Sequence, residues 1–145
     1  MSELSFALME TGALLPHEEV EEDRLASLTD EIRRDGCLRE PVLVDRVTLI
    51  ILDGHHRVQA LQALGCLLVP AYLVDYRSQG IQVWPWRQDT PVDKDSVVDR
   101  GLARRPYPPR TSRHVLAGAP GPRPVDLAFL AALGEEVGLQ AVADR

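Results

Sequence analysis

The chain has 145 residues, of which 45% are apolar, 26% charged and 5% aromatic. This length suits one domain with its own core, because single domains commonly contain about 100–150 residues. The composition excludes a wholly disordered chain, and no apolar run reaches the roughly 20 residues that cross a bilayer. The first residues lack the basic segment of a secretory signal, so we expect a cytoplasmic protein without membrane contact.

Charge is distributed unevenly along the chain. The formal net charge is −6, from 22 acidic and 16 basic residues. Arg24 is the only basic residue among the first 31, whereas residues 100–113 contain five arginines and no acid. An acidic surface repels nucleic-acid phosphates, so we expect no nucleic-acid partner. The arginine cluster is compatible with a local anion site or with a solvated basic surface.

The first predicted helix is marked by residues typical of a helix start and a helix end on either side of an apolar pattern. Pro16 and the acidic residues up to Asp23 predict the start of a helix, because the helix dipole favours negative charge there. Leucines and an isoleucine then recur at helical spacing, and Gly36 is a typical stop.

Further along, the sequence predicts short strands and helices in alternation. Two runs, 41–44 and 49–52, read as a hairpin. The remaining expected elements are a helix ending at Gly65, strands at 69–74 and 81–84, a helix within 91–102, a Gly/Pro-rich linker at 117–124 and a helical segment at 125–145. In that last segment Leu127, Leu130, Leu133 and Val137 are candidates for core packing or for a homodimer contact.

The most informative motif is Asp53-Gly54-His55-His56-Arg57, between an expected strand and an expected helix. Backbone N–H groups at a helix start bind anions, and a glycine lets a phosphate approach closely. Arginine offers a bidentate fork for phosphate, histidine can donate to it, and aspartate can hold a metal or orient a hydroxyl. An Asp-Gly turn with surface histidines is the structural alternative.

Two other segments carry suitable chemistry. Glu18 follows Pro16-His17, although a carboxylate there can simply favour a helix start. The second segment, Thr111-Ser112-Arg113-His114, can form a phosphate or carboxylate cradle or an ordinary polar loop. Trp86 can line a pocket or belong to the core.

Taken in order, these segments resemble the ParB/sulfiredoxin-fold superfamily and, within it, the free serine kinases. The resemblance runs from about Leu14 to Leu116 and rests on Leu15-Pro16-His17-Glu18, Ile51 to Arg57, Val83-Trp84-Pro85-Trp86 and Pro109 to Leu116. It implies an α+β fold: a small mixed sheet flanked by helices, in a catalytic domain at 1–116 followed by the C-terminal helical tail.

The resemblance also implies an activity, the transfer of a phosphoryl group from ADP or ATP to the hydroxyl of free L-serine with Mg²⁺. By position, Glu18 would activate the hydroxyl, and Asp53 would assist it or hold Mg²⁺ through the phosphates. Residues 53–57 would bind the nucleotide phosphates. Trp86 and residues 111–114 (Thr111, Ser112, Arg113 and His114) would hold serine and the transferred phosphate.

The chain is shorter than those kinases between Trp86 and residues 111–114. Only residues 87–110 connect the two segments, so a segment that closes over the site would be reduced. The alternative function is that of a ParB-like nucleotide-binding regulator or DNA-associated protein, including proteins described as nucleases. A sulfiredoxin-like reductase would need a cysteine where this chain has His55. A nuclease would need a set of paired metal-binding carboxylates, which the motif does not offer.

Overall fold

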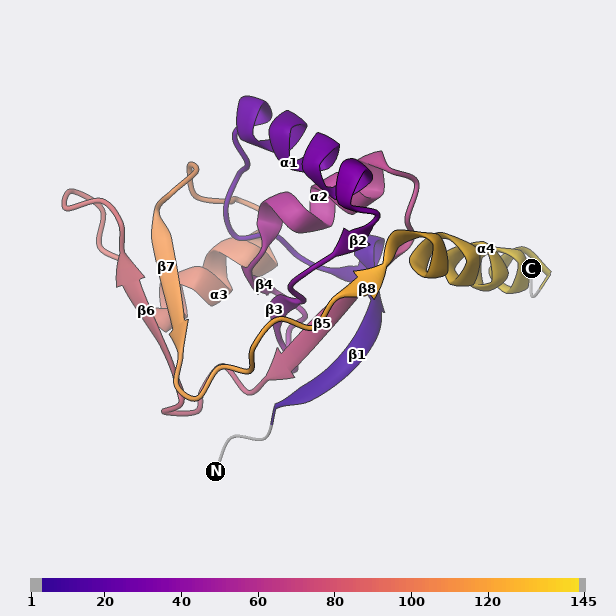
Figure 1. Cartoon of the computed structure of the whole chain (residues 1–145). Helices are drawn as coiled ribbons and strands as arrows, with labels where there is room; N and C mark the ends of the chain where they lie inside the picture. Colours follow the sequence, from indigo (N-terminus) through magenta and orange to yellow (C-terminus); the bar gives the residue numbers. More distant parts are fainter. Residues whose placement is uncertain (1–3, 144–145) are drawn as a thin grey trace.

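A four-stranded mixed sheet forms the centre of the molecule (Figure 1). The structure, a computed structural model, describes residues 4–143, with side chains through residue 136. The strand order is β1-β5-β3-β4, with β1 at Ser5–Glu10, β3 at Val42–Asp45, β4 at Ile51–Asp53 and β5 at Leu68–Val74. The β3–β5 pair is parallel and the other two pairs are antiparallel. The predicted α+β fold with a small mixed sheet is therefore confirmed.

The predicted hairpin forms between β3 and β4, and a buried carboxylate fixes its turn. Asp45 accepts hydrogen bonds from the Thr48 hydroxyl at 2.6 Å and from the backbone N–H of Tyr76 at 3.2 Å. Leu49 adopts a φ of 63°, which the turn requires. The turn directs β4 so that its last residue, Asp53, leads straight into the next helix.

Two helices cover one side of this sheet. Helix α1 spans Glu22–Asp35 and helix α2 spans His55–Ala63, and they pack against each other. Helix α1 ends where the sequence predicts, since Gly36 takes the left-handed conformation with φ 70° and donates to the carbonyl of Ile32. Its start differs from the prediction, because residues 16–21 form an extended loop.

A second, two-stranded sheet lies beside the first (Figure 1). It pairs β6, Ile81–Pro85, with β7, Ser112–Leu116, and helix α3 at Lys94–Ala103 lies in the connection between them. Helix α3 packs closely on the main sheet, because a Cβ on Gly101 would come within 2.6 Å of the Ile50 side chain. Strand β7 thereby lies next to β4, so residues 112–114 approach the end of the main sheet.

The C-terminal segment returns to the main core. Residues 117–124 contain no helix or strand, and β8 at Val125–Asp126 then pairs with β2 at Cys37–Leu38. Helix α4 follows at Leu127–Ala143 and extends away from the body (Figure 1). Leu130 is fully buried against the core, with Leu127 and Leu133 packed around it, whereas Val137 lies outside the described side chains. The division into a domain at 1–116 and a separate tail remains a prediction.

Two features differ from the sequence reading. Strand β1 was not predicted, because Ser5–Glu10 has no clear alternation and includes poor strand formers; pairing with β5 imposes its conformation. The segment at 125–145 begins with strand β8 rather than with a helix. In the described part of the chain, no helix is both long and apolar enough to span a membrane.

Leu130→Ala tests whether α4 belongs to the core. We expect the free energy of unfolding to fall by about 2–5 kcal/mol, because a fully buried leucine leaves a cavity. The adjacent Phe129 is 53% exposed, and Phe129→Ala should change stability by no more than about 0.5 kcal/mol. Urea unfolding of both variants makes the comparison. Equal effects would mean that α4 does not pack as described.

Candidate active site

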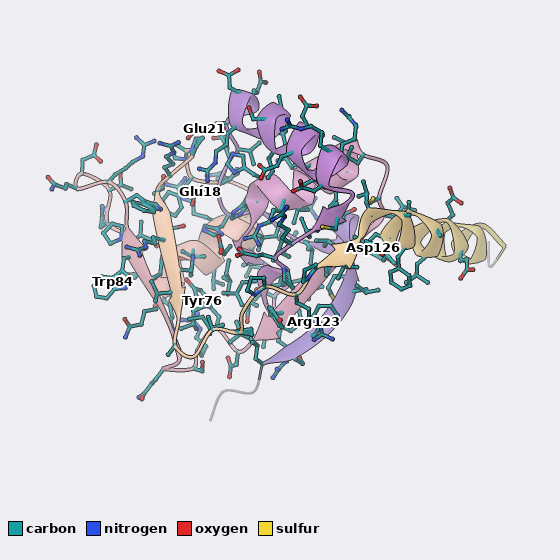
Figure 2. The ribbon with its side chains drawn as sticks, viewed as in Figure 1. Glu18, Glu21, Tyr76, Trp84, Arg123 and Asp126 are labelled. Atoms are coloured by element: carbon teal, nitrogen blue, oxygen red, sulfur yellow. The ribbon has the colours of Figure 1, made fainter. Side chains whose placement is uncertain are left out.

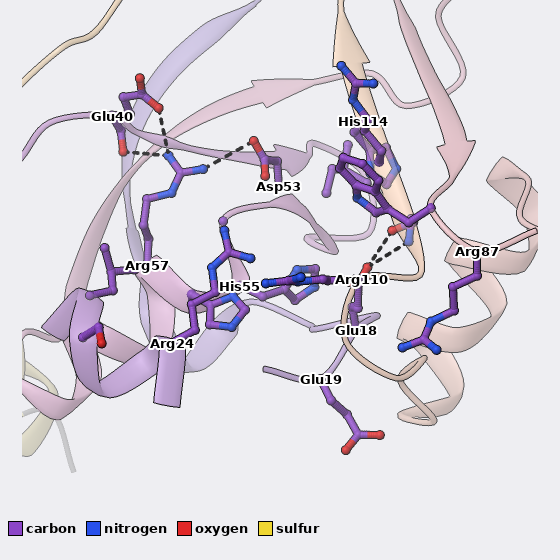
Figure 3. Close-up of a pocket in the computed structure, with 18 of the residues that line it drawn as sticks. Glu18, Glu19, Arg24, Glu40, Asp53, His55, Arg57, Arg87, Arg110 and His114 are labelled. Atoms are coloured by element: carbon purple, nitrogen blue, oxygen red, sulfur yellow. Dashed lines mark hydrogen bonds and ion pairs between the residues drawn. The ribbon is translucent and has the colours of Figure 1, made fainter. Parts of the chain in front are cut away.

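A cavity of about 1060 Å³ opens where the two sheets meet the start of α2. Figure 2 shows Glu18 between the helices and β7, and Figure 3 shows the cavity with its lining residues. The predicted site residues that line it are Glu18, Asp53, Gly54, His55, His56, Arg57, Trp86, Ser112, Arg113 and His114. The structure therefore brings all three sequence motifs to one cavity.

The strand-to-helix corner forms the floor of the cavity. Gly54 has a φ of 108°, and a Cβ there would lie 2.5 Å from the Val42 side chain, so only glycine fits. No side chain caps α2, and the N–H groups of its first turn have no partner within the helix. With the helix dipole, these N–H groups can bind an anion in the cavity.

Arg57 braces this corner. Its guanidinium donates to the carbonyl of Glu40 at 3.0 Å and to the carboxylate of Asp53 at 3.4 Å (Figure 3). It also donates to the carbonyl of Pro41 at 2.8 Å. The side chain is only 18% exposed. Part of the guanidinium is therefore committed to shaping the corner, and the remaining donors face the cavity that Arg57 helps to line.

Glu18 is held by three donors from the second sheet. Its carboxylate accepts from the backbone N–H of Thr111 at 3.1 Å. It also accepts from the backbone N–H of Ser112 at 3.3 Å and from the Ser112 hydroxyl at 2.7 Å (Figure 3). The surrounding loop is pinned by backbone bonds between Tyr107 and its two partners, His17 and Glu19. Glu18 thus lies on a fixed loop before α1, which corrects the expectation that it opens the first helix.

Three histidine rings cluster behind the carboxylate. The ring of His17 lies edge-on to His55 at 4.6 Å and to His114 at 5.4 Å. Burial, with smaller contributions from the neighbouring imidazoles, lowers the pKa of His55 well below its usual range and that of His114 to about 3. Burial likewise lowers the pKa of His17. We conclude that the cluster is predominantly neutral near pH 7.

Hydrogen bonds orient both histidines of the corner. The Nε2 atom of His55 accepts the backbone N–H of His17 at 3.2 Å, and the Nε2 atom of His56 accepts that of Glu21 at 3.0 Å. Each Nε2 is therefore unprotonated in this geometry, which leaves Nδ1 as the position that carries the proton. Both residues connect the start of α2 to the loop that carries Glu18.

The opposite wall comes from the second sheet. Trp86 is exposed, and the Arg113 guanidinium lies 5.4 Å from its ring centre. His114 Nε2 lies 2.8 Å from the Tyr76 hydroxyl, which fixes its ring at the base of this wall. Thr111 takes part through its backbone N–H, since its fully buried hydroxyl donates to the carbonyl of Pro108 at 2.7 Å.

Sequence reasoning missed two residues of this site. His17 is completely buried and bonds to the Ser112 hydroxyl, a contact between residues 95 positions apart that no local pattern reveals. Arg24, in the first turn of α1, also lines the cavity. The sequence does single out Arg24, because it is the only arginine or lysine among the first 31 residues, which are rich in acidic side chains. Its charge faces the same space as Arg113.

The strand-to-helix corner offers a metal ion one carboxylate rather than a complete set of ligands. In the described part of the chain, no three His, Cys, Asp or Glu side chains gather as metal ligands. Asp53 is 66% exposed at the cavity and points one oxygen toward Arg57. A single carboxylate fits Mg²⁺ that is carried mainly by substrate phosphates, which is how Mg²⁺ commonly binds.

Comparison with known proteins shows the family to which the chain belongs. The family model described as the ParB N-terminal domain matches residues 1–82. The chain belongs to the ParB N-terminal domain family.

Two of the curated relatives that the chain matches are named L-serine kinases. An ATP-dependent L-serine kinase of Staphylothermus marinus is 35% identical over 83 residues, which is 54% of this chain and 33% of the relative. The ADP-dependent L-serine kinase SerK of Thermococcus kodakarensis is 29% identical over 101 residues, which is 67% of this chain and 42% of SerK. This ParB-family chain therefore spans about a third to two-fifths of the length of these relatives.

A solved structure shares the fold. A free serine kinase in complex with AMP superposes with a TM-score of 0.80 at 17% identity, covering 86% of this chain and 93% of that one. At this identity the likeness shows the fold alone. It agrees with the arrangement of a mixed sheet and helices described above.

The neutral histidines predict a stability that depends on pH. The unfolded chain binds protons at histidine near pH 6.5, whereas folded His114 does not do so until about pH 3. Stability should therefore fall as the pH drops below 6.5, by up to about 1.4 kcal/mol per pH unit for each such histidine.

His114→Gln provides the test. The variant removes one titrating group and keeps an amide near the Tyr76 hydroxyl. Urea unfolding between pH 6.5 and about pH 5, above the range in which most carboxylates titrate, should show a weaker dependence in His114→Gln than in the wild type. An identical dependence in both proteins would contradict the neutral state of His114.

Proposed function

We propose that this protein transfers a phosphoryl group from ADP or ATP to the hydroxyl of free L-serine, giving O-phospho-L-serine. The observation that carries the proposal is the placement of Glu18 and the N-terminus of α2 in one cavity. A carboxylate can accept a proton from an attacking hydroxyl, and a helix N-terminus can bind the phosphates of the donor. The names of the relatives support this substrate pair.

The proposed division of labour follows from the contacts. The N–H groups at the start of α2, next to Gly54, hold the terminal phosphates of the nucleotide. Arg57 braces this corner, while Arg24 and Arg113 add positive charge around the moving phosphoryl group. Phosphoryl transfer requires mainly alignment and charge stabilisation, and an arginine-lined cavity in an acidic protein supplies both.

The acceptor is assigned to the wall formed by Trp86, Ser112, Arg113 and His114. The guanidinium of Arg113 suits the carboxylate of an amino acid, since the two can pair through parallel hydrogen bonds. Trp86 offers a flat face that limits the size of the acceptor. Glu18, fixed by Thr111 and Ser112, then faces the hydroxyl from the protein side.

Mg²⁺ is part of the proposal as a companion of the nucleotide. Asp53 would hold it together with the phosphates, and the ion would supply charge that offsets the negative charge of the phosphoryl group. A cytoplasmic location, a homodimer and the absence of a nucleic-acid partner remain predictions from the sequence.

Glu18→Gln tests the base. The amide keeps the size of the side chain but cannot accept the proton, so phosphoserine formation should fall by at least about 100-fold. Nucleotide affinity should change little, because Glu18 does not belong to the helix N-terminus. The assay follows phosphorylated amino acid by mass spectrometry with Mg²⁺, each nucleotide and free amino acids.

Glu22→Gln is the matched control, since Glu22 lies in the first turn of α1 outside the cavity. Retained turnover in Glu18→Gln would remove Glu18 as the base. Nucleotide binding by the wild type without any phosphorylated amino acid would favour the alternative, a nucleotide-binding regulator.

Arg57→Ala tests the phosphate corner. We expect the Kd for ADP or ATP to rise by about tenfold, which corresponds to about 1.4 kcal/mol, because the corner loses both a charge and its brace to Glu40 and Pro41. Isothermal titration calorimetry measures the change. Arg39→Ala, which removes an exposed ion pair with Asp35, is the control. An unchanged Kd in Arg57→Ala would refute the phosphate site.

A further inference from the structure

A chain of short contacts runs from Glu18 into the protein interior. The Glu18 carboxylate lies 2.7 Å from the Ser112 hydroxyl, which in turn lies 2.8 Å from His17 Nε2. The other ring nitrogen, His17 Nδ1, lies 2.6 Å from the carbonyl of Ile51. Glu18 and Ser112 line the cavity, whereas His17 is fully buried and does not line it.

These three contacts need more protons than the neutral groups carry. The carbonyl of Ile51 can only accept, so His17 Nδ1 must donate to it. A neutral imidazole then offers a lone pair at Nε2, and Ser112 has one hydroxyl proton for two acceptors. With Glu18 ionised and His17 neutral, the chain therefore holds two protons for three contacts. One contact must place lone pairs against each other.

The surroundings keep His17 from supplying the missing proton itself. His55 and His114 face its ring from α2 and β7, and Lys94 lies beyond His114, so these groups offer no negative charge. Glu18 is the only acidic side chain that faces His17 among the described residues, with its carboxylate 3.7 Å from Nε2. Burial lowers the pKa of His17 in this setting.

We propose that Glu18, Ser112 and His17 form one proton-accepting unit, in which Ser112 and His17 are positioning residues for the base. This inference rests on the proposed function. As the hydroxyl oxygen of the acceptor bonds to phosphorus, the bridging P–O bond breaks and its electron pair leaves with the nucleotide. The hydroxyl proton passes to Glu18, which then donates to Ser112 while Ser112 donates to His17.

Transfer of that proton completes the hydrogen bonding of the whole chain. All three contacts then have one donor and one acceptor each, and the repulsion between lone pairs disappears. The unit thus binds the reaction's proton more strongly than a carboxylate held by backbone N–H groups alone. It also gives His17 a role that neither the sequence motif nor the cavity lining assigns.

Two variants break the unit without removing Glu18. Ser112→Ala deletes the linking hydroxyl and keeps the backbone N–H that holds the carboxylate. His17→Asn keeps a donor toward Ile51 but has no atom near Ser112. Ser112→Thr restores the hydroxyl. Thr29→Val is the matched control, since Thr29 is 8% exposed, close to the 9% of Ser112, and its hydroxyl donates to Leu25 away from the cavity.

The kinetic readout is the pH profile of phosphoserine formation. We expect Ser112→Ala and His17→Asn to lower kcat by about 10- to 100-fold and to move the acidic limb of the kcat profile to lower pH. The KM for nucleotide should stay unchanged, and Ser112→Thr should restore both kcat and the limb. A fall in kcat with an unmoved limb, or an unchanged kcat, would overturn the proposal.

A second readout does not depend on turnover. In protein labelled with ¹⁵N-histidine and free of substrates, the His17 Nε2 signal should shift with pH in the wild type and in Thr29→Val. The same shift should be lost or displaced in Ser112→Ala and Glu18→Gln. A pH response identical in wild type and Ser112→Ala would refute the proton-accepting unit. If the wild type phosphorylates no amino acid, the proposed function fails, and this titration still decides the inference.

Discussion

The carboxylate of Glu18, held by two backbone N–H groups and one hydroxyl, is the contact on which the site depends. It joins a loop near the start of the chain to β7, more than 90 residues later, and so closes the cavity between the two sheets. Two further polar contacts, Ser112 with His17 and His114 with Tyr76, tie β7 to the same region. The hydrogen bonds that His55 and His56 accept from backbone N–H groups of the same loop complete the arrangement. The loop that carries Glu18 is therefore fixed both from the start of α2 and from β7, which favours a preformed geometry over one assembled by a ligand.

Local signals were enough to predict the strand-to-helix corner, whereas the position of Glu18 depends on tertiary structure. The order strand, Asp-Gly, helix is written in consecutive residues, and Gly54 is required by both its φ and the Val42 side chain. Glu18 was found through a resemblance but was assigned to a helix, because Pro16 and the following acids are also typical of a helix start. The bridges of this segment to Ile50 and Tyr107 override that preference, and neither partner is near in sequence.

The same distinction explains the other misses. Strand β1 forms because β5 offers it an edge, since its own residues favour a strand only weakly. His17 was noticed only as part of a motif and was given no role, because its contact with Ser112 joins distant parts of the chain. The hairpin and the stop at Gly36 depend on residues only a few positions apart, and these were predicted correctly. What sequence reasoning recovers here is the chemistry of short segments, and what it lacks is the pairing between distant ones.

The connection between Trp86 and β7 limits how the cavity can be closed. Helix α3 fills much of that connection and is held on the main sheet by close packing of Gly101 on Ile50, so it is not free to move as a lid. The parts that remain are residues 87–93 and residues 104–111, and Arg87 joins them by donating to the carbonyl of Pro109 at 2.7 Å. Under the proposed function, positive charge would help to retain a small anionic substrate in this cavity. This accounts for the concentration of Arg24, Arg110 and Arg113 around the cavity of a protein whose net charge is −6.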